Sequence, residues 1–334
     1  MLQMPCGQCV RACLLMLQRP DGGACQMSLH SAGFQRSSRG NLEEVLIAGT
    51  SLEQIATGFQ FVEGPAWHRE KKSLVFSDII GNCIYRWSET SDVSIFRKPS
   101  FMANGNSWDH QGRLVTCEHA CSRISRGDTD GSYEVLASHY EGRELNSPND
   151  IVVSSNGDIF FTDPNSGRGR RYGVEREQQL DFQGVFRLDP DSRKLTLLVD
   201  DFAKPNGLCF SPDESQLFIN DTDRQHIRVF DLSGDGGLRN GRTWASVDGD
   251  QPGDADGMKF DSQGNLYCCG SGGIHVFDPD AGRLGIIPTP EFAANFTWGG
   301  DELTDMFITA TTSIYRLRVN IPGLEPRVNN LSTS

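Results

Sequence analysis

The stretch Glu63-Gly64-Pro65-Ala66-Trp67 begins a pattern that the chain repeats six times before Val319. In each repeat a polar residue opens an apolar run, and a turn, a second apolar run and another turn follow. The openings lie 38 to 57 residues apart, a period typical of β-propeller blades. The other five are Asn104-Gly105-Asn106-Ser107-Trp108, Asn149-Asp150-Ile151-Val152-Val153, Asn206-Gly207-Leu208-Cys209-Phe210, Asp256-Gly257-Met258-Lys259-Phe260 and Ala294-Asn295-Phe296-Thr297-Trp298.

The runs in each repeat have the composition of β-strands. The second runs are short, rich in β-branched and aromatic residues, and bounded by turn residues, as in Ile159-Phe160-Phe161-Thr162. The third runs alternate with period two, as in Ile227-Arg228-Val229-Phe230, and no segment keeps a helical period. The sequence therefore predicts an all-β, six-bladed β-propeller over residues 41–325. We expect the segment Val45 to Phe59 to add the outer strand of the last blade.

The composition favours a small-molecule partner. The 334 residues include 44 acidic and 31 basic side chains and no basic tract, which argues against a nucleic-acid partner. No apolar run approaches the roughly 20 residues that cross a bilayer, so we expect no membrane partner and a cytoplasmic location. Residues 1–40 are expected to form a poorly ordered extension and residues 326–334 a C-terminal tail. In that extension Cys6 and Cys9 lack the further ligands of a zinc site.

The opening residues predict a metal site. In a propeller these six positions converge at the top of the central channel and form a ring of oxygen ligands. Carboxylate and amide oxygens favour Ca²⁺, with Mg²⁺, Mn²⁺ or Zn²⁺ possible. Glu63 and Asp256 would supply two charges, and Asn149 and Asn206 neutral oxygens. The alternative is that Asx-Gly pairs serve turns alone, but the shared register, and a Glu before Gly-Pro, favour a site.

The ends of the second strands should lie at the same face as the openings. Glu118 and Asp163 are placed there, in a second ring of carboxylates around the first. His119 also lies there, and we interpret it as a hydrogen-bonded structural histidine rather than a catalytic one. The insertion Pro164 to Gln183 should hang over the channel mouth. Its arginines indicate either a lid that attracts anionic substrates or a solvated loop that offsets nearby acids. They are Arg168, Arg170, Arg171 and Arg176.

Several motifs resemble those of the gluconolactonase, senescence-marker-protein and regucalcin-like family, and microbial-type gluconolactonases in particular. The resemblance implies a six-bladed propeller with one divalent metal ion, commonly Ca²⁺. It implies Glu63, Asn206 and Asp256 as metal ligands, and Asn149 as a contact to metal or substrate. The chain departs from the family at Asn165-Ser166-Gly167, where relatives often have Tyr-Gly. The matching motifs are Phe61-Val62-Glu63-Gly64-Pro65-Ala66-Trp67, Asn146-Ser147-Pro148-Asn149-Asp150, Lys204-Pro205-Asn206-Gly207-Leu208 and Ala255-Asp256-Gly257-Met258-Lys259.

The expected function is hydrolysis of a sugar lactone, such as glucono-1,5-lactone, to the aldonic acid. A divalent metal is expected as Lewis acid and Asp256 as general base. Asn149 would orient the substrate, and Asn104, Glu118 and Asp163 are further candidates for substrate contacts. Two alternatives stay open, a broader esterase or organophosphate hydrolase and a calcium-binding propeller without turnover. A serine hydrolase is disfavoured because no Gly-x-Ser-x-Gly motif occurs.

Overall fold

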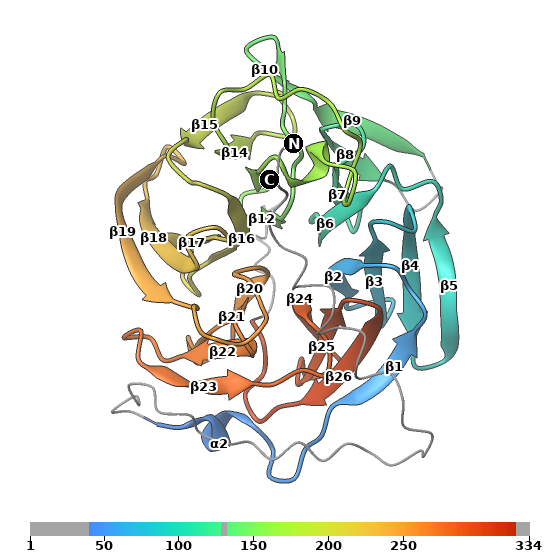
Figure 1. The fold of residues 1–334 in the computed structure, drawn as a ribbon, viewed down its shortest axis with the longest axis vertical. Helices are drawn as coiled ribbons and strands as arrows, with labels where there is room; N and C mark the ends of the chain where they lie inside the picture. Colours follow the sequence, from blue (N-terminus) through green and yellow to red (C-terminus); the bar gives the residue numbers. More distant parts are fainter. Residues whose placement is uncertain (1–39, 128–131, 325–334) are drawn as a thin grey trace, which may run out of the picture. The chain divides into compact units, whose positions relative to one another are not determined.

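The computed structural model describes residues 40–127 and 132–324. The predicted extension, apart from Gly40, and the predicted tail lie outside the described residues. Six four-stranded antiparallel sheets are arranged in a ring, as Figure 1 shows. This confirms the predicted all-β, six-bladed propeller. We number the blades 1 to 6 by their innermost strands in chain order.

Each blade is built from four strands, counted from the ring axis outward. The innermost strands are β2 (Val62–His68), β6 (Ala103–Trp108), β12 (Ile151–Val153), β16 (Pro205–Phe210), β20 (Met258–Phe260) and β24 (Ala293–Gly299). The second strands are β3 (Ser73–Asp78), β7 (Leu114–Glu118), β13 (Ile159–Asp163), β17 (Gln216–Asp221), β21 (Leu266–Gly270) and β25 (Asp305–Ala310). The third strands are β4 (Cys83–Ser88), β8 (Arg123–Gly127), β14 (Gly184–Leu188), β18 (His226–Leu232), β22 (Gly273–Phe277) and β26 (Ser313–Arg318).

The outer strands complete the ring. They are β5 (Ser91–Arg97), β9 (Tyr133–Ala137), β15 (Leu195–Val199), β19 (Leu238–Ser246), β23 (Arg283–Ile287) and, for blade 6, β1 (Glu53–Thr57). Because β1 pairs antiparallel with β26, the start of the propeller closes its last sheet, as predicted. The short elements are α2 (Leu42–Val45), the 3-10 turn η1 (Ser166–Arg168), and the hairpin of β10 (His139–Tyr140) and β11 (Arg143–Glu144).

The core lies between the blades. The described residues contain six clusters of buried apolar side chains, and each cluster joins two neighbouring blades. The ring of Trp67 in blade 1 stacks on Phe307 of blade 6, with centroids 5.3 Å apart. Trp298 of blade 6 donates to the carbonyl of Phe260 in blade 5 at 3.0 Å. No helix among residues 40–127 and 132–324 is long and apolar enough to span a membrane.

Strand pairing brings the openings and the ends of the second strands to one face. Glu63 pairs with Ser77, and Pro205 pairs with Asp221. The antiparallel order therefore places both predicted rings at the same end of the ring axis, as we inferred from strand direction.

Candidate active site

The innermost strands are irregular where the opening residues lie. In four blades the register shifts at this point, between Glu63 and Ala66, Ala103 and Asn106, Pro205 and Leu208, and Ala293 and Asn295. In blades 3 and 5 the innermost strand begins only after Asn149 and Asp256. Such irregularities release side chains from the alternation of a regular strand and often lie beside functional sites. In all six blades the backbone is therefore irregular at the opening residue, and this irregularity changes the direction of the opening side chain.

The glycines after the openings allow neighbouring blades to approach closely. A Cβ atom on Gly64 would lie well under 3.0 Å from the carbonyl oxygen of Asn104, and Gly64 also has a φ of +53°. A Cβ atom on Gly207 would clash in the same way with the carbonyl oxygen of Asp256. Glycine is therefore needed for close backbone approach at these positions, which turn formation alone does not explain. The same relation joins Gly105 to the Asn149 carbonyl, whereas a Cβ atom on Gly257 would clash with the side chain and the Cα atom of Asn295.

Hydrogen bonds between blades hold the backbone of the opening residues. The Ser77 hydroxyl donates to the Asn104 carbonyl at 2.7 Å. The amide of Gly105 donates to the Asn149 carbonyl at 2.8 Å. Two further links continue this series around the ring. They are the Thr162 hydroxyl to the Asn206 carbonyl at 2.8 Å and the Asn220 amide to the Asp256 carbonyl. The site is thus preorganised by its own scaffold.

Glu63 and Asp256 meet as a pair of buried carboxyl groups. They are 3% and 9% exposed and lie on blades 1 and 5. Burial, and then the charge of Asp150, raise the pKa of Glu63 to about 7. Burial, and then the charge of Glu63, raise the pKa of Asp256 well above its usual value, and a hydrogen bond between the two side chains raises it further. Two carboxylates this close repel each other unless a proton or a cation lies between them.

Three polar side chains surround this pair. Asp150 is 5% exposed, and burial raises its pKa. The Asn295 side chain hydrogen-bonds Glu63, which lowers the pKa of that carboxyl group. The ammonium group of Lys259 lies 3.3 Å from Asn295 Oδ1, and its charge lowers the pKa of both Glu63 and Asp150. One cationic side chain therefore acts on two of the three acidic groups, Glu63 and Asp150.

Buried oxygen atoms around the pair have no protein partner. They are Oδ1 of Asn104, Oδ1 of Asn206 and Oδ2 of Asp150. The Nδ2 atom of Asn206 donates to Thr222 at 3.0 Å, so its amide is oriented and its oxygen is left available. No group of three or more His, Cys, Asp and Glu side chains that could by itself hold a metal ion occurs among the described residues. The donor set is instead a mixture of two carboxylates and several carboxamides, and its unpartnered oxygens fit a hard divalent cation.

The predicted substrate contacts Glu118 and Asp163 are turned into the fold. Both are fully buried. The oxygens of Glu118 accept from Arg123 and from the Ser125 hydroxyl, both at 2.5 Å. Those of Asp163 accept from the backbone amides of Asn146 and Ser147, both at 2.8 Å. Their oxygens are engaged by hydrogen bonds within the protein, and a contact of either residue with substrate stays a prediction. Asp163 fastens the loop that leads to Asn149.

His119 orients Asn104. Its Nδ1 atom lies 2.8 Å from the carbonyl oxygen of Tyr172, and its Nε2 atom lies 3.3 Å from Nδ2 of Asn104. The geometry assigns the proton to Nδ1, so that Nε2 accepts from the amide and Asn104 Oδ1 is left unpartnered. The histidine is 1% exposed and acts as a structural group, as expected.

We expect His119 to make the protein less stable in acid. Burial lowers its pKa to about 4, whereas an unfolded histidine titrates near 6.5. The unfolded state therefore binds an extra proton between these values, so the free energy of unfolding falls as the pH falls from 6.5 to 4. Denaturant titrations across this range measure how the free energy of unfolding changes with pH. For His119→Gln this slope should be shallower than for the unaltered protein by up to about 1.4 kcal/mol per pH unit. Equal slopes for both proteins would contradict the assignment of this acid sensitivity to His119.

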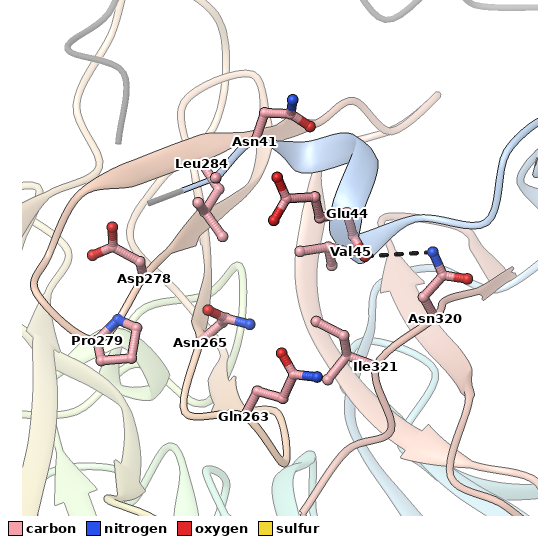
Figure 2. A pocket seen from close by; sticks show the side chains of 11 residues that line it. Asn41, Glu44, Val45, Gln263, Asn265, Asp278, Pro279, Leu284, Asn320 and Ile321 are labelled. Carbon is pink, nitrogen blue, oxygen red and sulfur yellow. Dashed lines mark hydrogen bonds between the residues drawn. The ribbon is translucent and has the colours of Figure 1, made fainter. Parts of the chain in front are cut away.

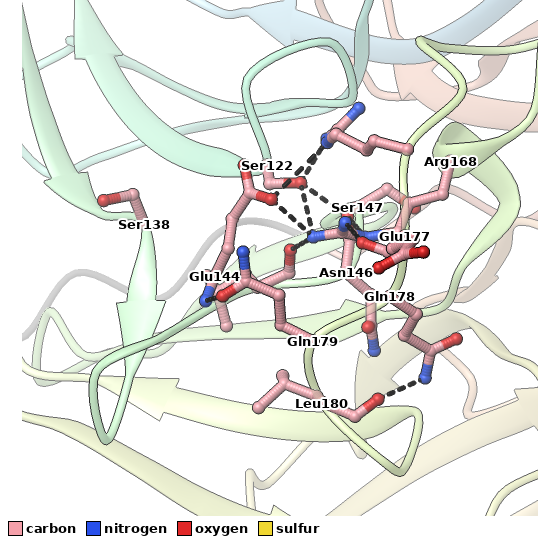
Figure 3. Close-up of polar contacts among 12 residues, drawn as sticks. Ser122, Ser138, Glu144, Asn146, Ser147, Arg168, Glu177, Gln178, Gln179 and Leu180 are labelled. Atoms are coloured by element: carbon pink, nitrogen blue, oxygen red, sulfur yellow. Dashed lines mark hydrogen bonds and ion pairs between the residues drawn. The ribbon is translucent and has the colours of Figure 1, made fainter.

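Two arginines of the insertion Pro164 to Gln183 are anchored inside the protein. Arg168 is 7% exposed, donates to the carbonyl of Asn146 at 2.9 Å and pairs with Glu144 at 2.8 Å. Arg176 donates to the carbonyl of His119 at 2.9 Å. Figure 3 shows Arg168 turned toward Glu144 and Asn146. The charges of these two arginines therefore hold the insertion in place, and attraction of an anionic substrate by the insertion stays a prediction.

The other two arginines of the insertion are exposed. Arg170 pairs with Glu175. The guanidinium group of Arg171 lies 4.8 Å from the ring centroid of Tyr172. The insertion was expected to be either a lid that attracts anionic substrates or a solvated loop that offsets nearby acids. Each description is incomplete, because the insertion has a buried anchor as well as a solvated tip.

A family model described as SMP-30/Gluconolactonase/LRE-like region matches residues 61–312. The chain belongs to this family. A gluconolactonase of Zymomonas mobilis is 33% identical over 305 residues, which cover 84% of this chain and 85% of that protein. The structure of a gluconolactonase from Xanthomonas campestris superposes with a TM-score of 0.77 at 36% identity, over 83% of this chain and 92% of that one. A diisopropyl-fluorophosphatase of Loligo vulgaris is 30% identical over 162 residues, 46% of this chain and 51% of that protein.

This member of the SMP-30/gluconolactonase family has site residues that sequence reasoning missed. Asp150 follows Asn149 directly, so the Asn-Asp pair in the sequence could have indicated a second site residue at this opening. Lys259 is a charged residue in an otherwise apolar innermost strand, which was a second signal. Tyr172 gave no signal, because only the folding of the insertion brings it to the site.

A separate pocket lies away from these residues. It measures about 350 Å³ and lies beside α2 and the turn between β20 and β21, at the opposite end of blade 5 from Asp256 (Figure 2). Its polar groups have structural roles. Asp278 accepts from the amides of Asp280 and Gly282, and Asn265 donates to Asp261. These hydrogen bonds distinguish the pocket of this SMP-30/gluconolactonase family member from the candidate site at the opening residues, where buried oxygens lack a protein partner.

Proposed function

We propose that the protein is a metal-dependent lactonase that hydrolyses a sugar lactone of the gluconolactone type to the aldonic acid. The observation that carries the proposal is the buried contact between Glu63 and Asp256, two acidic groups from blades 1 and 5. Such a contact lowers the stability of the fold, and a bound cation would turn it into an attraction. Family membership, with gluconolactonases among the relatives, supports the lactone as substrate.

The residues that would hold the cation are Glu63, Asn149, Asn206 and Asp256, with Ca²⁺ as the first candidate. When bound, the cation supplies a Lewis acid for the lactone carbonyl and lowers the pKa of water. The backbone hydrogen bonds between blades keep these residues in place before substrate arrives. Lys259 supplies a compensating charge that acts on Glu63.

Asp256 is the proposed general base. It would take a proton from the attacking water as a new C–O bond forms at the carbonyl carbon. When the ring C–O bond breaks, Asp256 would return that proton to the departing alkoxide, so that water is consumed and the open acid is formed. Burial raises the pKa of Asp256 in the metal-free protein, and a bound cation would lower it again, so that the carboxylate can accept the proton from water. Asn104, which His119 orients, would bind a hydroxyl group of the sugar through its unpartnered Oδ1 atom.

Removal of the metal should abolish turnover and lower stability. We expect chelation to reduce the rate of glucono-1,5-lactone hydrolysis by about a hundredfold or more, and added Ca²⁺ to restore it. At a calcium concentration of about 100 times the Kd, the ion should also stabilise the fold by about 2.7 kcal/mol. The measurements are a pH-stat assay and a thermal melt, each before and after chelation. Stabilisation by Ca²⁺ without metal-dependent turnover would identify a calcium-binding propeller instead.

A phosphotriesterase is the second candidate, because a diisopropyl-fluorophosphatase matches 46% of the chain. The same acidic site could direct water to a phosphoryl centre. Glucono-1,5-lactone, an aliphatic lactone and diisopropyl fluorophosphate should therefore be assayed side by side. The proposed function requires the highest kcat/KM for the sugar lactone.

A further inference from the structure

The insertion Pro164 to Gln183 has a defined structure over the site. The amide of Gly167 donates to the Ser147 hydroxyl at 2.9 Å, and the amide of Val174 donates to the Gly167 carbonyl at 3.1 Å. A Cβ atom on Gly167 would clash with His119, and one on Gly173 would clash with Gly167. Close packing and the buried Arg168 therefore determine where the tip of the insertion lies.

This packing places Tyr172 in contact with His119 and Phe61. Its carbonyl oxygen is held by His119, which also contacts Asn104. Its ring lies 4.9 Å from the ring of Phe61, with an angle of 55° between the planes. Phe61 comes two residues before Glu63 in the chain. Burial raises the pKa of Tyr172, the charge of Arg171 lowers it, and the charges of Asp256 and Glu63 raise it, so the phenol lies within electrostatic reach of the acidic pair.

We propose that Tyr172 and Phe61 form an aromatic corner that binds the ring of a six-membered sugar lactone. This inference rests on the proposed function, and it names a substrate contact that belongs to the insertion of this chain. The two rings are partly exposed, so part of their surface is free for a ligand. The C–H groups of a pyranose-type ring pack well on an aromatic surface, and the phenol adds a hydrogen-bonding group. Tyr172 acts in substrate binding, while Asp256 acts in the chemical step.

The test compares Tyr172→Ala and Tyr172→Phe with Tyr133→Ala. Tyr133 is an exposed tyrosine on β9, 45% exposed, and serves as the matched control. Tyr172→Ala should raise the KM for glucono-1,5-lactone about fivefold to tenfold at nearly constant kcat, because an aromatic contact is lost. Tyr172→Phe should recover most of this loss. All variants should keep the thermal midpoint of the unaltered protein.

A binding measurement separates this inference from the proposed function. The probe is 1,5-anhydro-D-glucitol, which has the ring and its hydroxyl groups but no ester. Calorimetry should show a Kd that is about fivefold weaker for Tyr172→Ala than for the unaltered protein. If the unaltered protein hydrolyses the lactone but Tyr172→Ala changes neither KM nor this Kd, the aromatic corner is wrong. If the unaltered protein does not hydrolyse the lactone, the proposed function is wrong, and the Kd alone decides on Tyr172.

Discussion

Asp256→Asn should lower kcat for glucono-1,5-lactone by about a thousandfold, which is the usual contribution of a general base. The same change should raise the thermal midpoint of the metal-free protein. Asparagine has nearly the shape of aspartate, but it removes one of two acidic groups that meet in a buried site. A loss of activity together with a gain in stability is the signature of a residue kept for function. Added Ca²⁺ should also stabilise this variant less than the unaltered protein.

Asp254→Asn is the matched control for this experiment. Asp254 lies two positions away, is exposed and accepts from Gln225 at 3.1 Å. Its charge raises the pKa of Asp256 less than burial, Glu63 and Asp150 do, and solvent weakens it, so we expect kcat to change by less than about twofold and the calcium response to persist. The measurements are steady-state kinetics and thermal melts with and without Ca²⁺. Full activity of Asp256→Asn in a folded protein would refute the assignment of the general base.

Much of the fold could be predicted because each blade repeats one local pattern. Alternating apolar runs and turns give strands, and a period that recurs six times gives the ring. Even the outer strand of blade 6 could be anticipated, since an incomplete last blade has to be closed by an earlier segment. The positions of Glu63 and Asp256 at one face followed from strand direction alone. Their direct contact did not, because it depends on how closely the blades approach.

Side-chain direction at the end of the second strands could not be predicted. Glu118 and Asp163 occupy the expected face, yet both carboxylates turn toward donors inside the protein. The sequence shows that an acidic residue ends a strand, but not whether a backbone amide or the ring axis faces it. Tyr172 illustrates the same limit, because the packing of Gly167 on His119 brings the insertion to the site. Such contacts join distant segments and have no local period.

From the sequence, the Asx-Gly pairs at the openings had a role in turns as the alternative. In the structure Gly207 allows blades 4 and 5 to approach closely, and Gly207→Ala tests this role. We expect this change to lower the free energy of unfolding by about 3 kcal/mol, at the upper end for an overpacked core position. The added methyl group would meet the Asp256 carbonyl and the amide of Asn220, two groups that hydrogen-bond each other. Blades 4 and 5 would have to separate, so lactone hydrolysis should fall as well.

Gly234→Ala provides the comparison. Gly234 lies between β18 and β19, and a Cβ atom there would have no atom within 4 Å. We therefore expect its free energy of unfolding to stay within about 0.5 kcal/mol of that of the unaltered protein. Denaturant titrations of both variants measure the difference, and the kinetic assay reports whether Asp256 has moved. A Gly207→Ala protein with unchanged stability and full activity would show that the glycine serves the turn alone. A large loss confined to Gly207→Ala would instead mean that the close approach of blades 4 and 5, which glycine allows, holds the backbone of Asp256 in place.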